Sequence, residues 1–418
     1  MLRLLPNSPA GSEPTLFDRR SKRVASSLPA AGFAAIAFLT VVGCDSGDSQ
    51  AAAPGAPDSA PPAQATPNAV SAVPEANGAP AIADPATGQP GSSERAKTFA
   101  EAAAKRIAEK PNVPGDDPAW FFLVRELKQM GLGEFWRKPW TEVAQNKTDP
   151  IPSMVEFHDL LKAKGVELII VPVPAKASIY PDKLDARFAP GDPYPLTPFI
   201  EKMKAKGLNV IDLEPLLRQR REAQPGEKLW CEQDAHYTPL TCQVIAGLVK
   251  TELEKGAWFA GQPKQELKRG EPTELEITGD QVKGSEWEGK VALEKLVVQY
   301  AGKEAAGTLE PVEPDAASPV LLLGDSHTLV FQEGASSGMH CKGAGLFDQL
   351  SYECGFPLDL VGVRGSGLVE ARKSLYRAAS PNPDYWTAKK AIVWVFSVRE
   401  FTQSFDNLIS IPIERKSS

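Results

Sequence analysis

Continuous apolar runs recur along residues 150–400, and they alternate with segments whose apolar residues fall three or four positions apart. A short run that is apolar at every position is typical of a strand buried on both faces, whereas the wider spacing is typical of an amphipathic helix. The runs expected to form strands are residues 166–173, 208–213, 320–323, 358–363 and 391–396. This alternation predicts an α/β domain whose mostly parallel sheet is covered by helices on both faces.

Helices are expected around these strands, at residues 94–110, 117–130, 151–164, 197–206, 238–255, 346–354 and 368–379. Asp117 followed by Pro118, and Thr238 followed by Pro239, are helix-start signals, because proline fits the first helical turn. In a parallel sheet, functional residues gather at the carboxyl ends of the strands. Polar motifs that directly follow the apolar runs are therefore candidate site residues.

Residues 258–318 have a different pattern. They are rich in charge, carry turn signals at Gly279-Asp280 and Gly284, and contain alternating runs at 274–278 and 295–300. This pattern predicts a β-rich insertion packed beside the sheet. Two interpretations of it stay open: the insertion shapes a cleft for an acceptor, or it only decorates the fold.

The amino terminus has the pattern of an export signal. Basic residues at 19–23 precede a thirteen-residue apolar stretch, 31–43, and Cys44 follows directly. Positive charge, a short apolar core and small residues at the cut are typical of a secretory signal, and the stretch is too short to favour a retained transmembrane helix. The pattern resembles a bacterial lipoprotein box, which implies cleavage before Cys44 and acylation of its thiol.

Residues 44–92 are expected to form a tether. Positions 45–92 hold nine prolines and fourteen alanines but no aromatic residue, lysine or arginine, so they cannot bury enough apolar surface to offset the entropy of ordering. The organisation predicted is a signal peptide at 1–43, a Pro/Ala-rich tether at 44–92 and a folded domain at 93–418. The expected location is the periplasm or the cell surface, with the chain held on a membrane through its lipid anchor.

Charge and cysteine content narrow the partners. The formal net charge of −7 makes nucleic acid an unlikely partner, and no metal or nucleotide motif is found, so no cofactor is expected. An even cysteine count in an exported domain favours disulfides, and we expect Cys231 to pair with Cys242 and Cys341 with Cys354, because these pairs close short loops. The alternative is that these cysteines are buried free thiols.

Two short motifs carry the candidate chemistry: Asp234-Ala235-His236, and Gly324-Asp325-Ser326 at the end of an apolar run. A serine hydroxyl becomes a nucleophile when an imidazole accepts its proton, and a carboxylate must hold that imidazole in the right tautomer. Positions two apart in an extended segment point the same way, so Asp234 and His236 can face one site. We therefore predict a catalytic triad of Ser326, His236 and Asp234.

Each motif alone has an ordinary structural explanation. Gly-Asp-Ser is a common turn, and Asp-x-His could cap the helix that follows. The other histidines are weaker candidates: His327 adjoins the serine and is expected to point elsewhere, His158 lies on an amphipathic helix, and His340 lies in a Gly/Ser-rich loop. The backbone N–H of Ser326 is a candidate donor to a developing oxyanion.

With these motifs in place, the chain resembles the SGNH-hydrolase-like domain of the alginate O-acetyltransferases, the AlgJ/AlgX type. Other matching segments are Trp120-Phe121-Phe122, the Val-Pro-Val-Pro-Ala-Lys of residues 171–176, Ile179-Tyr180-Pro181, and Val393-Trp394-Val395-Phe396 with Arg399. The family pattern around the base reads Asp-Thr-His-Trp, whereas this chain has Ala235 and Tyr237 at the second and fourth positions.

The resemblance implies O-acetylation of an exported polysaccharide through an acyl-enzyme on Ser326, with His236 acting first as base and then as acid. It also implies a membrane-bound partner protein that delivers acetyl groups. Arg364 matches a family arginine with a polarising or acceptor-binding role, although it could instead cap a helix or pair with a carboxylate. Tyr237 is expected to line the site and Arg399 to brace the fold. The alternatives are a carbohydrate acetylesterase with the same triad and a noncatalytic glycan-binding lipoprotein.

Overall fold

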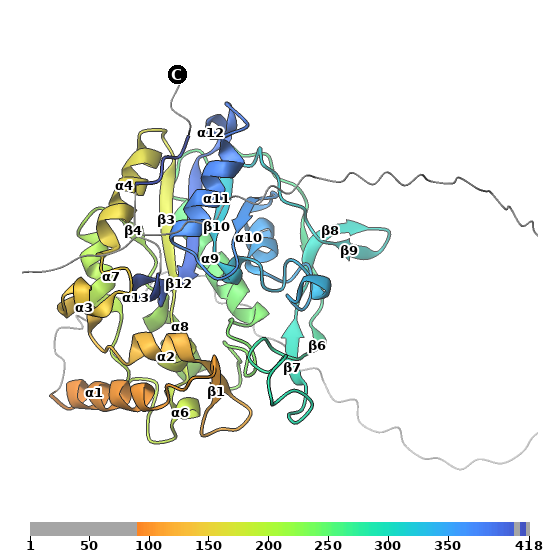
Figure 1. The fold of residues 1–418 in the computed structure, drawn as a ribbon. Coiled ribbons are helices and arrows are strands. Elements are labelled where there is room, and N and C mark those ends of the chain that lie inside the picture. The colour runs from red at the N-terminus through yellow and green to blue at the C-terminus, as the bar shows by residue number, and fades with distance from the viewer. Residues whose placement is uncertain (1–89, 405–409, 415–418) are drawn as a thin grey trace, which may run out of the picture. The chain divides into compact units, whose positions relative to one another are not determined.

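The computed structural model describes residues 90–404 and 410–414 (Figure 1). The predicted signal peptide with Cys44, and the tether as far as residue 89, lie outside the described residues. Helix α1 (Pro90–Lys105) begins within the last residues that the sequence assigns to the tether. Among the described residues, no helix has both the length and the apolar character needed to cross a bilayer.

A five-stranded parallel sheet forms the centre of the domain (Figure 1). Its strands are β3 (Glu167–Val173), β4 (Asn209–Val210), β10 (Val320–Gly324), β11 (Asp359–Gly362) and β12 (Ala391–Ser397). Their order across the sheet is β11-β10-β12-β3-β4, and every neighbouring pair is parallel. All five runs singled out in the sequence are strands of this sheet, and the predicted fold class is confirmed.

The sheet is buried on both faces because alternate side chains of its strands enter two separate cores. On β3, Ile169 and Val171 face one core, whereas Leu168 and Ile170 face the other. The first core is completed by α8 (Leu213–Ala223), α9 (Pro239–Leu253) and α10 (Leu346–Cys354), and the second by α4 (Ile151–Lys162), α7 (Thr197–Lys204) and α11 (Val369–Ala379). Each fully buried aliphatic side chain contributes about 1.5–3 kcal/mol, so the apolar runs dominate the stability of the sheet.

One predicted helix is partly wrong. Residues 121–123 do not continue a helix from Asp117 but form strand β2 (Phe121–Leu123), which pairs antiparallel with β1 (Asn112–Pro114). The helix α2 begins only at Val124 and spans Val124–Met130. The backbone N–H of Phe121 donates to the carbonyl of Glu232 at 2.8 Å, so a tertiary contact holds this segment extended.

Short helices complete the layers. They are η1 (Phe135–Arg137), α3 (Trp140–Val143), α5 (Lys176–Ile179), α6 (Pro181–Leu184), η2 (Ser326–Thr328), η3 (Ala335–Ser337), α12 (Tyr385–Ala388) and α13 (Glu400–Gln403). Two of them, α5 and α13, closely follow the carboxyl ends of β3 and β12, and η2 closely follows that of β10. Polar groups of three neighbouring strands therefore meet at one edge of the sheet.

The segment between α9 and β10 forms two small antiparallel sheets, drawn in teal to one side of the central sheet in Figure 1. Their strands are β5 (Lys268–Arg269), β6 (Thr273–Ile277), β7 (Glu294–Val298), β8 (Ala301–Ala305) and β9 (Thr308–Glu310). The β6–β7 pair has Leu275 opposite Leu296, and β8 lies between β5 and β9. We call residues 258–318 the insertion, and its β-rich character agrees with the prediction.

Candidate active site

The nucleophile turn, residues 324–328, follows β10 directly. Gly324 is required here because a Cβ at this position would lie only 2.0 Å from the Val395 carbonyl oxygen of the neighbouring strand. The Asp325 carboxylate accepts hydrogen bonds from the backbone N–H groups of Ser397, at 2.8 Å, and of His327, at 3.0 Å. The turn is thus tied to the sheet, and Ser326 begins the helix η2 with a fixed orientation.

The base loop, residues 232–237, precedes α9. Asp234 accepts a hydrogen bond from the backbone N–H of His236 at 3.0 Å, which folds the loop into a local turn closed by the side chain of Asp234. A single β-bridge joins Trp230 to Tyr237 on either side of the loop. The loop lies outside the central sheet, so other contacts must hold it in place.

The structure brings Ser326, His236 and Asp234 together. Ser326 Oγ lies 2.7 Å from His236 Nε2, and His236 Nδ1 lies 2.6 Å from Asp234 Oδ1. Asp234 and His236 are both buried, whereas Ser326 is partly exposed. A hydroxyl that solvent can reach, backed by a buried base and a buried carboxylate, is the arrangement that nucleophilic catalysis by serine requires.

Four N–H groups donate to the carboxylate of Asp234. Oδ1 accepts from the ring and the backbone of His236, while Oδ2 accepts from the backbone of Asp280, at 2.9 Å, and from the His340 ring, at 2.8 Å. Burial alone would raise the pKa of Asp234, but His236 and His340 outweigh it and hold the pKa well below its usual range. Asp234 is therefore ionised and acts only as an acceptor.

His236 is a strong base in this environment. Burial lowers the pKa of an imidazole, but the charge and hydrogen bond of Asp234, together with Asp280 and Asp325, raise the pKa of His236 to about 9. Because Asp234 fixes the proton on Nδ1, the neutral ring presents the lone pair of Nε2 to Ser326 Oγ–H. No hydrogen bond in the described part of the chain uses the Ser326 N–H, so this donor is open to an oxyanion.

The insertion holds the base loop in place. The buried carboxylate of Glu294, at the start of β7, accepts the backbone N–H groups of Glu232 and Gln233 at 2.7 and 2.9 Å. Gln281 N–H donates to the Gln233 carbonyl at 3.1 Å, and a Cβ on Gly279 would lie 2.1 Å from the same oxygen. The insertion is therefore not mere decoration, since it fixes the position of the base.

Lys176 supports the loop from the side of the sheet. Lys176 follows β3 in the chain, and its side chain is fully buried. Its Nζ donates to the Phe121 carbonyl and to Gln281 Oε1, both at 2.7 Å, and to the Glu232 carbonyl at 3.3 Å. These bonds offset part of the cost of burying an ammonium group. Lys176 thus joins β2, the base loop and the insertion at one point.

Three of these supporting residues were missed by the sequence interpretation. The sequence pattern places His340 in a Gly/Ser-rich loop and Asp280 in a turn, and it gives no signal for Glu294. Their separations from the base loop, 106 residues for His340 and 62 for Glu294, explain why no local pattern reveals them. One signal in the sequence could have pointed to His340. The chain has only four histidines, so each of them can be considered as a site residue.

Tyr237 does not line the site as expected. Its side chain is fully buried, and its hydroxyl donates to the His327 carbonyl at 2.6 Å. A buried phenol cannot contact an acceptor, so the predicted substrate-binding role of Tyr237 is wrong. Tyr237 instead ties the base loop to the nucleophile turn. The ring of His327, a residue of that turn, packs against the His236 ring with the centroids 4.8 Å apart.

Arg364 follows β11 and is about half exposed. Its guanidinium donates to Glu333 Oε2 at 2.5 Å and to the Ser337 carbonyl at 2.8 Å, which is the carboxylate pairing left open by the sequence. Its role in binding an acceptor stays a prediction.

Arg399, after β12, is buried among the charges of Asp325, Glu126 and Glu400, in keeping with the expected bracing role.

The predicted disulfides are wrong. Cys231, Cys242, Cys341 and Cys354 are all free thiols in the structure. Cys231 Sγ faces the Tyr237 carbonyl at 3.8 Å, and the first core encloses both Cys231 and Cys242. Burial raises the pKa of the Cys231 thiol well above its usual value and that of Cys341 to about 12. These cysteines pack in or against the first core as free thiols, so the short loops between them did not predict disulfides.

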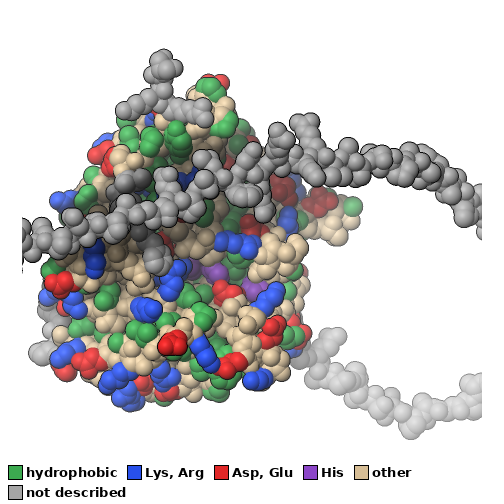
Figure 2. All heavy atoms as spheres, viewed as in Figure 1, with side chains coloured by type: hydrophobic (Ala, Val, Ile, Leu, Met, Phe, Trp, Pro, Cys, Tyr) green, Lys and Arg blue, Asp and Glu red, His purple; other side chains and the backbone are tan. Residues whose placement is uncertain are grey.

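Asp234, His236 and Asp280 offer atoms within 4.8 Å of one another that could hold a metal ion. However, both oxygens of Asp234 already accept hydrogen bonds from N–H groups. His236 Nδ1 carries a proton and donates to Asp234, so it has no lone pair for a metal ion. The arrangement therefore fits a triad, and we assign no metal to it. Figure 2 shows histidine side chains reaching the middle of one face, beside basic and acidic groups.

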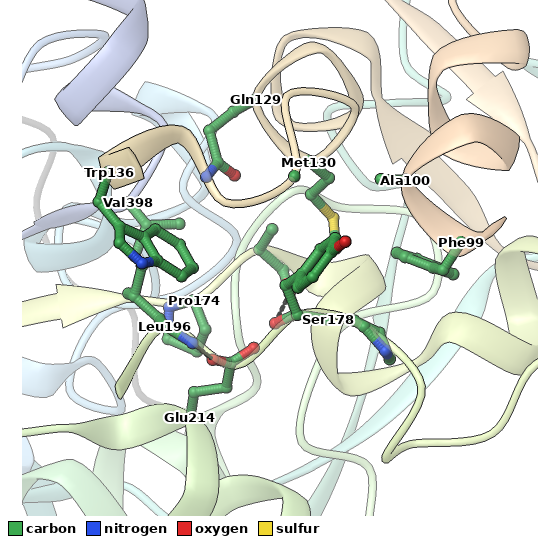
Figure 3. A pocket seen from close by; sticks show the side chains of 14 residues that line it. Phe99, Ala100, Gln129, Met130, Trp136, Pro174, Ser178, Leu196, Glu214 and Val398 are labelled. Carbon is green, nitrogen blue, oxygen red and sulfur yellow. Dashed lines mark hydrogen bonds between the residues drawn. The ribbon is translucent and has the colours of Figure 1, made fainter. Parts of the chain in front are cut away.

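A separate cavity of about 40 Å³ lies near the carboxyl ends of β3 and β12. Figure 3 shows Trp136 and Gln129 directed toward it, with Pro174 and Val398 on its wall. None of the three triad residues lines it, and its volume suits a few water molecules rather than a sugar. Trp136 Nε1, which has no partner within the described residues, is a natural donor to such water.

The chain is similar in sequence to known proteins. The alginate biosynthesis protein AlgX of Pseudomonas fluorescens is 25% identical over 276 residues, which are 61% of this chain and 52% of that protein. The probable alginate O-acetylase AlgJ of Pseudomonas syringae pv. tomato is 24% identical over 164 residues, 37% of each chain. This chain thus spans about half the length, or less, of the curated relatives it matches.

Among solved structures, the O-acetyltransferase domain of Pseudomonas putida AlgJ has a TM-score of 0.51 at 19% identity, over 71% of this chain and 93% of that one. At this identity the likeness concerns the fold alone. A family model described as the SGNH hydrolase-like domain of the acetyltransferase AlgX matches residues 113–337, which is more than half of the chain and includes Asp234, His236 and Ser326. The chain belongs to this family of SGNH hydrolase-like domains.

Proposed function

We propose that this chain is an exported O-acetyltransferase that passes acetyl groups through Ser326 to hydroxyl groups of a polysaccharide. The observation that carries the proposal is the 2.7 Å contact between Ser326 Oγ and His236 Nε2, with Asp234 behind the ring. Membership of the AlgX family supports acetyl as the group transferred. The relatives are named for alginate, which supports an exported polysaccharide of that kind as the acceptor.

In the first half-reaction, Ser326 Oγ attacks the carbonyl carbon of the acetyl donor, and the hydroxyl proton moves to His236 Nε2. The negative charge that develops on the carbonyl oxygen is stabilised by the Ser326 N–H, which is free to donate. The tetrahedral intermediate then collapses, the proton passes from His236 to the leaving group, and an acetyl ester remains on Ser326. Asp234 stabilises the imidazolium between the two proton transfers.

In the second half-reaction, a sugar hydroxyl attacks the acetyl ester while His236 removes its proton. Collapse of this intermediate breaks the bond to Ser326 Oγ, which recovers its proton from His236. Water in place of the sugar would give hydrolysis, so transfer depends on an acceptor that is bound at the site before water arrives. Arg364 stays a candidate contact for that acceptor, since it is exposed after β11.

The location and the partner belong to the same proposal. An apolar stretch followed by Cys44 supports export and lipid anchoring, and the Pro/Ala-rich tether would let the domain reach a polysaccharide away from the membrane surface. A membrane-bound protein would deliver the acetyl groups. Incorporation of labelled fatty acid into the wild-type chain but not into Cys44→Ala tests the anchor. Labelling that persists in Cys44→Ala would refute it.

Acetyl transfer itself is tested with the purified mature chain, an activated acetyl ester and alginate oligosaccharides. Acetylated sugar should appear with the wild type and fall by at least about 10³-fold in Ser326→Ala. Ser380→Ala is a matched control, because Ser380 also loses a hydroxyl hydrogen bond, to the Tyr376 carbonyl at the end of α11. Free acetate without acetylated sugar would support an esterase, and activity independent of Ser326 would refute the triad.

A further inference from the structure

The catalytic carboxylate is bound by two imidazoles. Asp234 receives the Nδ1 proton of His236 on one oxygen and the Nε2 proton of His340 on the other, at 2.6 and 2.8 Å. The side chain of His340 is only 9% exposed, so water cannot easily replace this bond. Because ionised Asp234 can only accept, Nε2 of His340 must carry a proton, which defines the tautomer of a neutral His340 ring.

The loop that carries His340 has an unusual backbone. Phe331 and His340 have φ angles of 59° and 66°, and the φ angles of Gly334, Gly338 and Gly343 are also positive. A residue with a Cβ costs about 1–2 kcal/mol in this conformation, and such strain persists where the surrounding structure requires it. The side-chain rings of Phe331 and His340 pack against each other with their centroids 5.3 Å apart. In this conformation the His340 ring packs against Phe331 and donates to Asp234.

Two sets of contacts hold this loop in place. At its base, the Phe331 backbone forms hydrogen bonds with Met339 and Ala344, both at 3.0 Å. At its tip, Arg364 reaches from the end of β11 and binds Glu333 and the Ser337 carbonyl. A parallel strand of the central sheet is thereby linked through Arg364 and the loop to the carboxylate of the triad.

We propose that His340 is a positioning residue for acyl transfer: it fixes the outer oxygen of Asp234 so that the inner oxygen stays aligned with His236. This inference rests on the proposed function and adds a fourth side chain to it. Without His340, Oδ2 keeps only the Asp280 N–H, and the carboxylate can rotate away from the imidazole. His340 Nε2 bonds to Asp234, and no hydrogen bond within the described residues joins His340 to Ser326 or His236, so we expect its effect on the rate of the chemical step rather than on acceptor binding.

The test compares three histidine substitutions in the full mature chain. His340→Phe keeps a ring against Phe331 but removes the donor, whereas the amide nitrogen of His340→Gln can donate from nearly the position of Nε2. His158→Phe is the control, since His158 also contacts an aspartate, Asp159 at 3.0 Å, and lies on α4, which packs against the second core. We expect kcat to fall about 10- to 100-fold in H340F with KM nearly unchanged, and to recover largely in H340Q.

A second readout does not depend on activity. The chain has four histidines, so imidazole ¹⁵N labelling gives a spectrum that substitution can assign. The proton between His236 Nδ1 and Asp234 should give a far-downfield signal that is present in the wild type, H340Q and H158F and is lost or broadened in H340F. Glu333→Gln removes the charge that pairs with Arg364 but leaves its hydrogen bond to the Ser337 carbonyl and keeps His340, so it should weaken the same signal to a smaller extent.

The inference is overturned if H340F keeps both the wild-type kcat and the His236 signal, or if H340Q, at an unchanged melting temperature, is as impaired as H340F. Loss of the signal in H340F with its retention in H340Q supports positioning even if the wild type transfers no acetyl group to sugar. That last outcome would count against the proposed function alone. The two proposals can therefore fail separately.

Discussion

The nucleophile turn and the base loop hold the two halves of the candidate site by different means. The turn follows β10, which is paired on both sides with β11 and β12, so backbone ladders and a buried apolar run fix Ser326. The base loop has no strand of the central sheet, and Glu294, Asp280, Lys176 and His340 hold it through polar contacts. The nucleophile thus depends on the fold as a whole, whereas the base depends on a few side chains.

The two regions should therefore respond differently to mutation. Loss of a contact around the nucleophile turn should destabilise the whole sheet, because packing there is shared with the two cores. Loss of one polar contact on the base loop should leave the fold intact and displace His236 by a fraction of an ångström, which catalysis does not tolerate. Five substitutions test this contrast.

Asp234→Asn should have the largest effect on activity. An amide of the same shape cannot hold His236 in the required tautomer, and kcat is expected to fall by about 10⁴-fold. The fold should persist, because the central sheet does not involve this loop. Steady-state rates and a melting curve are the measurements, and a kcat within about tenfold of the wild type would contradict the role of Asp234.

Two glycine substitutions separate the regions most directly. Gly324→Ala places a Cβ 2.0 Å from the Val395 oxygen between β10 and β12, and should lower the free energy of unfolding by about 3 kcal/mol or more. Gly279→Ala places a Cβ 2.1 Å from the Gln233 oxygen, and should lower kcat by about 100-fold while costing less stability. Denaturant titration and kinetics of both variants give the comparison, and equal losses of stability would contradict it.

Glu294→Gln should have a moderate effect. The amide keeps one acceptor for the backbone of the base loop, but its NH₂ group opposes the second N–H, so one buried donor is left unpaired at a cost of about 1–3 kcal/mol. We expect kcat to fall about tenfold. Glu276→Gln on β6, where the side chain is about half exposed, is the matched control. Similar rates for the two variants would show that Glu294 does not position the base.

Asp280→Asn should mainly change the pH dependence. His236 must be neutral to accept a proton, so activity should rise with pH toward its pKa of about 9. Asp280 Oδ2 lies 3.9 Å from His236 Nδ1, and its negative charge favours the imidazolium; removing it should lower the pKa of His236 and move the rising limb to lower pH. The side chain is 47% exposed, so solvent screens the effect to a few-fold in kcat/KM.

Partial burial and the charge of Asp234 raise the pKa of Asp280 to about 6, so below that pH the wild-type carboxyl is also neutral. The difference between wild type and Asp280→Asn should therefore be largest between pH 6 and 9 and fade at lower pH. A limb that stays in place or moves to higher pH would contradict the electrostatic role of Asp280.

The same contrast explains how much could be predicted. Val320 to Leu323, followed by Gly324 and Ser326, predicted the strand and the nucleophile turn, because apolar runs and tight turns are local patterns. Asp234 and His236 form a local motif that the sequence reveals. Glu294 lies 62 residues from Glu232, and His340 lies 106 residues from Asp234, so no local sequence pattern predicts these contacts.

The errors have the same origin. The backbone of Phe121 is held by Glu232, far along the chain, so local helix signals misled the interpretation of residues 117–123. Tyr237 and the cysteines were judged from their neighbours in sequence, whereas their burial depends on the tertiary core. Local pattern therefore predicts the elements and the strand ends, and tertiary polar contacts decide the rest.

The central claim is that Ser326 carries the acetyl group, and the direct test is to map the acyl-enzyme. The mature chain would be incubated briefly with an activated acetyl ester without sugar, quenched in acid and digested. Mass spectrometry should find one acetyl group on the peptide that contains Ser326, and oligosaccharide added before the quench should discharge it. A Ser326 peptide that stays unmodified, or labelling that is unchanged in Ser326→Ala, would contradict the account.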